Sequence, residues 1–270
     1  MHIQQSTSPS YMRQMARLRP RLQLSLAKNQ YEIREAQRLR YTVFGEELGA
    51  HLFEQIPGHD TDLFDAHCDH LLVRDHNTDQ VVGTYRLISP EAARSVGRYY
   101  AEGEFSLTRL QHLQPRMIEI GRFCIHANYR NGGVMALLWS GLGQYIACRD
   151  YKYLIGSASI SMADGGHNAA NIYQQLSEEQ KTPAEYRAAP LHPLPFRELA
   201  NGKPARIPPL LKGYLRAGGR VCGEPAWDTE FNTADLLFLL PMVRLNKRYG
   251  RAFLEPYRSS KRLHQNHRML

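Results

Sequence analysis

The spacing of apolar positions alternates along the chain between a period of two and a period of three to four, which predict strands and helices respectively. Strands are predicted at 22–26, 70–74, 80–88, 116–126, 153–160, 220–227 and 234–240. Helices are predicted at 30–48, 90–97, 133–146, 167–176, 210–215 and 243–254. Early hairpins followed by a strand–glycine turn–helix unit indicate an α+β sheet domain.

The two ends and one internal segment depart from this pattern. We expect residues 1–20 to form a flexible basic arm, residues 21–255 a single domain, and residues 256–270 a basic tail. The segment 183–209 holds seven of the fifteen prolines. Proline cannot continue a helix or a central strand, so we expect an extended, turn-rich excursion there.

Composition places the chain among soluble globular proteins, with 43% hydrophobic and 22% charged residues. No apolar run approaches the roughly 18–20 residues of a membrane span. The first ten residues lack the apolar core of a signal peptide. The four cysteines are widely spaced without a C-x-x-C pair, which favours reduced thiols over a metal or disulfide framework. We therefore expect a cytoplasmic protein without a metal site.

The formal net charge of +8 favours an acidic partner, which could be nucleic acid, an anionic bilayer or an acidic protein. The basic residues concentrate towards the two ends, where a solvated surface explains them equally well. No nucleic-acid-binding motif accompanies the charge. Charge alone therefore does not decide the partner.

Several charged residues stand where a folding domain would favour apolar ones. They are Arg40, Asp60, Asp62, Asp65, Arg86, Glu119 and Arg122. A buried charge without a partner is costly, so such residues must be paired or must serve a function. If they converge on one cleft, we expect a site that handles a charged substrate.

Arg122 and Glu119 lie three residues apart in one predicted strand. Strict alternation places Arg122 on the same face as Ile118, Ile120 and Cys124, where it would need a carboxylate partner. Asp62 and Asp65 are the expected partners, with Arg86 in the same network; a purely structural network is the alternative. Glu119 should face the other way unless a β-bulge re-aims it.

A glycine turn, Arg130-Asn131-Gly132-Gly133, connects the central strand to a helix. Glycine lets the backbone approach a ligand, and the free N–H groups at a helix start favour phosphate. A phosphopantetheine arm would fit there, although an ordinary turn has the same appearance. The group Asp62, His67, Asp69 and His70 has the spacing of no standard zinc signature.

These residues together resemble the L-ornithine N(alpha)-acyltransferases that form ornithine lipids, a branch of the GNAT-like acyltransferases. The resemblance spans roughly residues 22–254 and rests on the segments 39–49, 62–73, 81–87, 119–122, 126–133, 208–215 and 223–228. It implies a GNAT-like mixed, mostly antiparallel twisted sheet flanked by helices. It also implies transfer of a 3-hydroxyacyl group from acyl carrier protein to the ornithine α-amine, with no tightly bound cofactor.

The first half also resembles the acyl-homoserine-lactone synthases. Their R-x-x-x-F, acidic, V-G-x-x-R and E-x-x-R elements match Arg40 and Phe44, Asp62 and Asp65, Arg86, and Glu119 and Arg122. The resemblance implies that these residues build the active site. Our hypothesis is that Glu119 acts as the base and that Asp62 and Asp65 either hold the ornithine side chain or lock Arg122 and Arg86. Acyl carrier protein is acidic, which would explain the basic charge.

The remaining assignments are less specific. Backbone N–H groups beside Ile125 and His126 are candidates for oxyanion stabilisation, and Glu224 and Asp228 are further candidates for binding the amino acid. Residues 130–133 differ from the Q/R-x-x-G-x-G/A loop of acetyl-CoA enzymes, which favours acyl carrier protein as the donor.

Alternatives are another amino-acid acceptor such as glycine, an acyl-CoA donor, or a non-catalytic module that binds acyl carrier protein or a membrane. An apolar stripe is flanked by basic residues and has two interpretations, peripheral contact with the inner membrane or, preferably, core packing. The stripe consists of Ile207, Leu210, Leu211, Tyr214 and Leu215.

Overall fold

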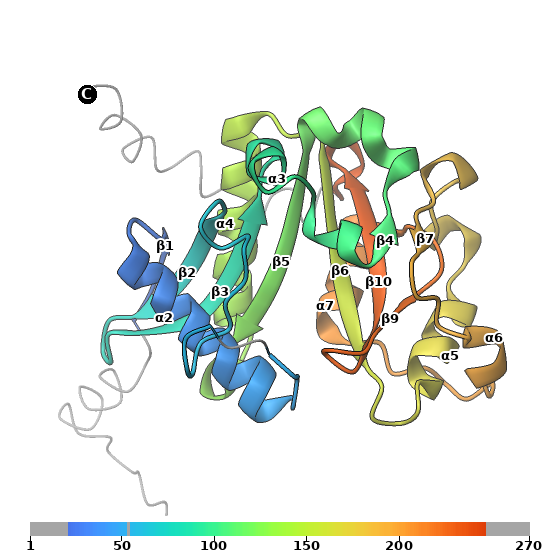
Figure 1. Ribbon diagram of the computed structural model, residues 1–270, viewed down its shortest axis with the longest axis horizontal. Helices are drawn as coiled ribbons and strands as arrows, with labels where there is room; N and C mark the ends of the chain where they lie inside the picture. Colours follow the sequence, from blue (N-terminus) through green and yellow to red (C-terminus); the bar gives the residue numbers. More distant parts are fainter. Residues whose placement is uncertain (1–20, 53–54, 247–270) are drawn as a thin grey trace, which may run out of the picture.

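A twisted mixed sheet runs through the centre of the molecule (Figure 1), which is a computed structural model describing residues 21–52 and 55–246. The strands follow the order β1-β2-β3-β5-β6-β10-β8, and β9 also pairs with β10. Their bounds are β1 Leu22–Leu26, β2 Asp69–Asp75, β3 Gln80–Ile88, β5 Met117–Ile125, β6 Tyr153–Ser161, β8 Arg220–Val221, β9 Ala226–Asp228 and β10 Thr233–Pro241. Only β5 and β6 run parallel among these pairs. The predicted mixed, mostly antiparallel α+β sheet is confirmed.

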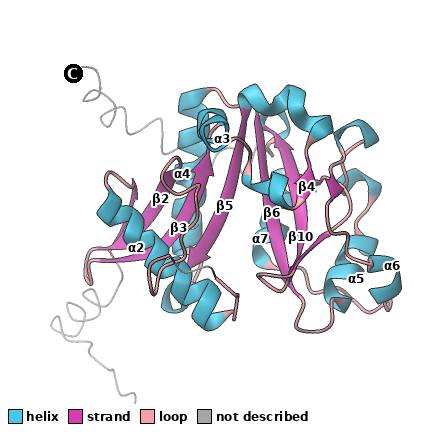
Figure 2. Ribbon diagram, viewed as in Figure 1, coloured by secondary structure: helices cyan, strands magenta, loops and turns pink. Residues whose placement is uncertain are grey.

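Helices cover both faces of the sheet (Figure 2). They are α2 Gln30–Arg40, α3 Pro90–Val96, α4 Gly133–Arg149, α5 His167–Gln175, α6 Phe196–Leu199 and α7 Pro209–Ala217. Side chains alternate along each strand, so Leu71 and Val73 pack with Leu138 of α4, whereas Leu72 packs with Leu39 of α2. A short two-stranded ladder, β4 Phe105–Ser106 with β7 Ala189–Pro190, lies beyond the main sheet.

Helix α2 leads directly into a π-helical turn, Tyr41–Glu47, where a single helix was predicted. Asn29 caps the start of α2 by accepting a hydrogen bond from Glu32 N at 3.0 Å. Gly49, with φ of +72°, follows the π-helical turn in the left-handed region that glycine adopts readily. A π-turn is common at functional sites, and this one lies beside the cleft described below.

The last third of the chain differs most from the predicted elements. The strand predicted at 220–227 is divided into β8 and β9, because Gly223 has φ of +117° and sits against Ala188 O, only 2.1 Å from where a Cβ would be. Residues 242–244 form a 3₁₀ turn where a helix was predicted at 243–254; residues 247–254 lie outside the described residues, as do the predicted arm and tail.

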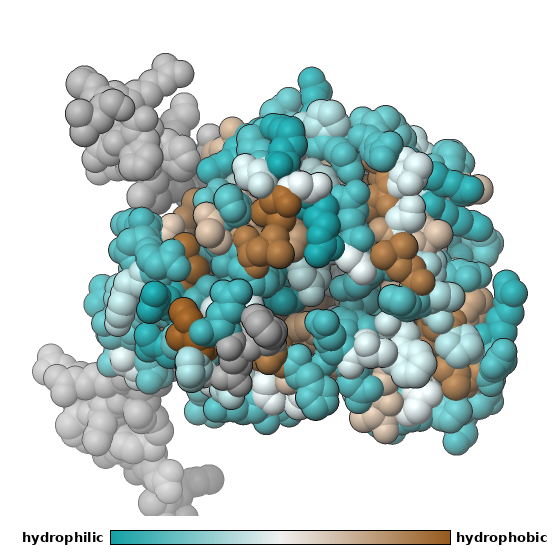
Figure 3. Space-filling view, in the orientation of Figure 1, coloured by the Kyte–Doolittle hydropathy of each residue, from teal (hydrophilic) through white to brown (hydrophobic). Residues whose placement is uncertain are grey.

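Four members of the apolar stripe lie on α7 and pack inward, whereas Ile207 precedes the helix and is 37% exposed. Leu211 and Tyr214 are 0% and 4% exposed, and Leu210 and Leu215 pack against the same core. On the face seen in Figure 3, hydrophilic side chains cover most of the surface and hydrophobic ones form small separate groups. None of the helices in the described part of the chain has the length and apolar character needed to span a bilayer.

Strands β5 and β6 pair over only part of their length. Their register covers Met117 to Glu119, after which the two strands diverge, as Figure 1 shows. Glu119 is therefore the last residue of β5 that pairs with β6 among the described residues. The rest of β5 borders β3 on one side and an opening on the other.

Candidate active site

A cleft of about 430 Å³ occupies the opening between β5 and β6. Its lining comes from segments far apart in sequence: the π-turn, β3, β5, β6, α7 and the β9–β10 hairpin. Polar and charged side chains gather at it, including Arg86, Glu119, Arg122 and Asp228. Apolar walls are supplied by Tyr85, Ile120, Phe123, Leu210 and Tyr214. The cleft thus combines an apolar part with a charged part, as a site for an amphiphilic substrate requires.

A buried ion-pair network stands behind the cleft wall. Arg40 is 0% exposed and contacts both oxygens of Asp65, at 2.8 and 2.7 Å, and Asp60 Oδ2 at 2.7 Å. Burial by itself would raise the pKa of Asp65, but the guanidinium groups of Arg40 and Arg86 outweigh it and hold that pKa well below its usual range. Arg40 does not line the cleft. It anchors the acidic loop to α2.

Arg86 and Arg122 extend this network into the cleft. Arg86 contacts Asp62 at 2.6 Å and Asp65 at 3.0 Å, while Arg122 contacts Asp60 at 3.0 Å and Asp62 at 3.3 Å. Three arginines thus face three aspartates, and their formal charges cancel. Asp62 and Asp65 are fully engaged by guanidinium groups, which favours the locking role over direct binding of a substrate cation.

A β-bulge explains how Arg122 reaches the aspartates. Thr84 pairs with Cys124 and Arg86 with Gly121, so two residues of β5 stand opposite Tyr85. Arg122 takes the extra position, with φ of +52°. The prediction that Arg122 shares a face with Ile118 and Ile120 is therefore wrong, because alternation is interrupted between them.

The same bulge brings Glu119 and Arg122 to one side of the sheet. Met117, two residues before Glu119, packs in the cluster that contains α3, and Cys124, two residues after Arg122, packs against α2. Both helices lie on the same face in Figure 1. Glu119 and Arg122 therefore both reach the cleft.

Glu119 is the buried carboxylate at the fork of the two strands. It is 2% exposed, and its two oxygens accept hydrogen bonds from Tyr100 N at 2.7 Å and Ala101 N at 2.8 Å. Burial raises its pKa to about 7, against the opposing effect of these two N–H donors and of Arg86. A carboxylate with this pKa can accept a proton near neutral pH.

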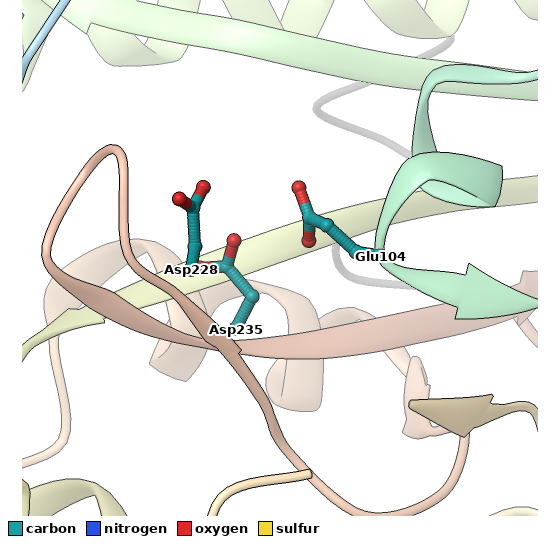
Figure 4. Close-up of side chains that lie close together, drawn as sticks. All are labelled: Glu104, Asp228 and Asp235. Atoms are coloured by element: carbon teal, nitrogen blue, oxygen red, sulfur yellow. The ribbon is translucent and has the colours of Figure 1, made fainter. Parts of the chain in front are cut away.

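A second acidic group lines the cleft, and sequence reasoning missed two of its three members. Glu104, Asp228 and Asp235 turn their carboxylates towards one another (Figure 4), with oxygens within 4.8 Å. Asp235 could have been found from the sequence in the same way as Arg86, because it is a charged residue inside an apolar run. Glu104 lies in an irregular segment and gave no comparable signal.

Of the other candidates, Phe44 lines the cleft and the rest lie outside its lining. Glu224 lines a different hollow and lies 3.7 Å from Arg197. His126 N donates to Val82 O at 3.0 Å, so this N–H is already engaged and is not available to an oxyanion. Arg130 bonds to Ile125 O at 3.0 Å and to Glu47. Phe44 does line the cleft and packs edge-on against Phe231.

The glycine turn lies at the end of β5, next to the start of α4. Gly132 is the N-cap of α4 with φ of +96°, and Gly133 N donates to Asn131 Oδ1 at 3.2 Å. These residues do not contribute to the lining of the cleft. The turn therefore forms no part of the cleft wall.

Comparison with known proteins assigns the chain to a family. Residues 39–140 match the model of the acetyltransferase (GNAT) domain. The chain is 34% identical over 247 residues to an L-ornithine N(alpha)-acyltransferase of Brucella abortus (strain 2308), covering 84% of this chain and 87% of that protein. This chain belongs to the L-ornithine N(alpha)-acyltransferase family. Its relative of the same name from Rhodobacter capsulatus is 34% identical over 241 residues, covering 84% of this chain and 92% of the other.

Solved structures share the fold at low identity. The acyl-homoserine-lactone synthase LasI aligns with a TM-score of 0.51 and 14% identity, covering 88% of this chain and 96% of that one. The CoA-dependent acyl-homoserine lactone synthase BjaI gives 0.52 and 12%, covering 87% and 89%. The predicted GNAT-like fold is thereby confirmed, and the chain is an acyltransferase by family.

Proposed function

We propose that this protein transfers a 3-hydroxyacyl group from the thioester of acyl carrier protein to the α-amine of L-ornithine, which forms a lyso-ornithine lipid. The observation that carries the proposal is Glu119, a buried carboxylate with a pKa of about 7 at the fork of β5 and β6. Family membership supports the acceptor, because the curated relatives are named for L-ornithine.

The reaction requires a neutral amine. Glu119 takes a proton from the α-ammonium, directly or through water, and the freed amine attacks the thioester carbonyl carbon. The tetrahedral intermediate collapses with formation of the amide C–N bond and cleavage of the C–S bond, and the phosphopantetheine thiol leaves with a proton. Each Glu119 oxygen accepts only one backbone N–H, so lone pairs remain for this transfer.

Arg86 and Arg122 bring guanidinium N–H donors to the same cleft as Glu119, although aspartates balance their formal charges. Both line the cleft, and both are fixed by Asp62. We assign them to the α-carboxylate of the amino acid, with Phe44 as an apolar wall. Arg40, Asp60 and Asp65 act one layer behind, by holding these arginines in position.

The donor enters through the opening between the strands. Beyond Glu119 the β5 backbone has no partner on its β6 side among the described residues, and Gly121, Arg122 and Phe123 line the cleft there. We place the thioester carbonyl against this backbone, with the phosphopantetheine phosphate near the start of α4 at residues 130–133. The net charge of +8 suits either anionic donor, and the departure of residues 130–133 from the loop of acetyl-CoA enzymes favours the carrier protein over free coenzyme A.

The direct test is acyl transfer with purified components. The protein is incubated with 3-hydroxyacyl carrier protein, or with the matching acyl-CoA, and a panel of amino acids, while free thiol and lipid mass are followed. We expect thiol release that depends on ornithine, an N-acylornithine product, and faster transfer from the carrier protein. Equal or faster transfer from acyl-CoA contradicts the donor assignment, and absence of N-acylornithine contradicts the acceptor.

A further inference from the structure

Three carboxylates form one end of the cleft. Glu104 precedes β4, Asp228 ends β9 and Asp235 lies in β10, and Figure 4 shows their carboxylates facing one another. Their oxygens lie within 4.8 Å of one another. Asp235 is only 3% exposed. Ser159 and Thr233 line the same end of the cleft.

This acidic group differs from the other carboxylates of the site because no cation balances it. Asp62 and Asp65 have arginine partners, and Glu119 has two N–H donors. Within 21–52 and 55–246, no Arg or Lys forms a salt bridge with Glu104, Asp228 or Asp235. The buried Oε2 atom of Glu104 accepts no hydrogen bond from an N–H or hydroxyl donor there, and a hydrogen bond between Glu104 and Asp235 requires that one of the two keeps a proton. Buried carboxylates of this kind either retain protons or are stabilised by a cation, which a ligand can bring.

We propose that Glu104, Asp228 and Asp235 bind the side-chain ammonium of the acceptor and so select a basic diamino acid over a neutral one. This inference rests on the proposed function, in which the α-amine of the same molecule lies at Glu119. A primary ammonium is compact and carries three N–H donors, one for each carboxylate.

The carboxyl groups at this end of the cleft are shifted towards their protonated forms. Burial, the neighbouring Asp235 and, to a smaller extent, Asp228 and Glu119 together raise the pKa of Glu104 to about 10. The pKa of Asp235 is also raised by burial. Before ligand arrives, the group therefore retains protons instead of carrying its full negative charge.

The test compares ornithine with norvaline, which has the same carbon chain but lacks the side-chain amine. We expect the wild-type protein to prefer ornithine in kcat/KM by at least about 100-fold, because a buried polar site left unpaired rejects the analogue strongly. In Asp228→Asn and Glu104→Gln this preference should fall at least about tenfold, which corresponds to the loss of one charge-assisted hydrogen bond. Glu198→Gln, a change of an exposed carboxylate on α6, should keep the wild-type preference.

The outcomes separate this inference from the proposed function. If the wild-type protein acylates norvaline as well as ornithine, or if both cleft variants keep the wild-type preference, the inference is wrong while amino-acid acylation stands. A divalent metal is the competing occupant. The inference would be overturned if EDTA abolished activity, if Mg²⁺ or Ca²⁺ restored it, and if the variants kept the wild-type substrate preference. The wild-type comparison remains decisive if a variant fails to fold.

Discussion

Replacing Asp65 with alanine should destabilise the fold more than most single changes. The Asp65 side chain is 5% exposed, holds Arg40 through two contacts of 2.8 and 2.7 Å and Arg86 through one of 3.0 Å, and accepts from Gln37 Nε2 at 2.9 Å. Its removal leaves two buried guanidinium groups short of a counter-charge. Breaking one partner of a buried pair costs about 3–5 kcal/mol, which we expect for the free energy of unfolding.

Urea unfolding at neutral pH measures this cost, and Asp79→Ala is the matched control. Asp79 is paired to Arg74 at 3.5 Å, but its side chain is 86% exposed, so loss of the pair should cost about 0–1 kcal/mol. Alanine in place of aspartate at a φ of +57° adds about 1 kcal/mol. Because the folded pKa of Asp65 is lowered, its stabilisation is present above the usual aspartate pKa of about 3.9 and is lost as pH falls below it. An Asp65→Ala cost no larger than that of Asp79→Ala would refute the claim that this network holds the site together.

Two further predictions concern the fork of β5 and β6. The logarithm of kcat/KM should rise with pH up to about 7 and then level off. The reason is that the base Glu119 acts only when ionised, and burial raises its pKa to about 7. A profile that is flat between about pH 5.5 and 7.5 would argue against this role. In Gly156→Ala the new Cβ would lie 2.6 Å from Ile120 O, so the free energy of unfolding should fall by about 1–3 kcal/mol. Gly133→Ala, whose Cβ meets its nearest atom at an ordinary 3.5 Å, is the control, and equal losses in thermal or urea unfolding would contradict the argument.

Strongly periodic segments were predictable from sequence because local periodicity reflects burial on one face. Strands β1, β3 and β6 and helices α3 and α5 agree with their predicted ranges to within a residue at either end. The convergence of Arg40, Arg86 and Arg122 on the acidic loop was also predictable. The cost of an unpaired buried charge requires such partners whatever the exact fold.

Other features depended on tertiary contacts that local patterns do not encode. The choice of Asp60 rather than Asp65 as a partner of Arg122 follows from the bulge in β5, and that bulge changes no apolar period. The separation of β8 from β9 follows from the close approach of Gly223 to Ala188 O. Glu104 and Asp235 meet only because β4 and β10 are neighbours of the same cleft, which no spacing in the sequence reveals.

Single-turnover acyl transfer by Glu119→Gln tests the central claim most directly. Glutamine preserves the shape and can accept one of the two backbone N–H groups, from Tyr100 or Ala101, while its NH2 group faces the other, but it cannot take a proton from the amine. Glu102→Gln is the matched control, because Glu102 caps the same turn through Tyr99 N at 2.7 Å and lies outside the cleft lining. With saturating ornithine and 3-hydroxyacyl carrier protein, we predict that Glu119→Gln slows transfer about 10²–10⁴-fold at neutral pH while its fold is retained and Glu102→Gln keeps the wild-type rate. A folded Glu119→Gln protein that transfers at the wild-type rate would contradict the account.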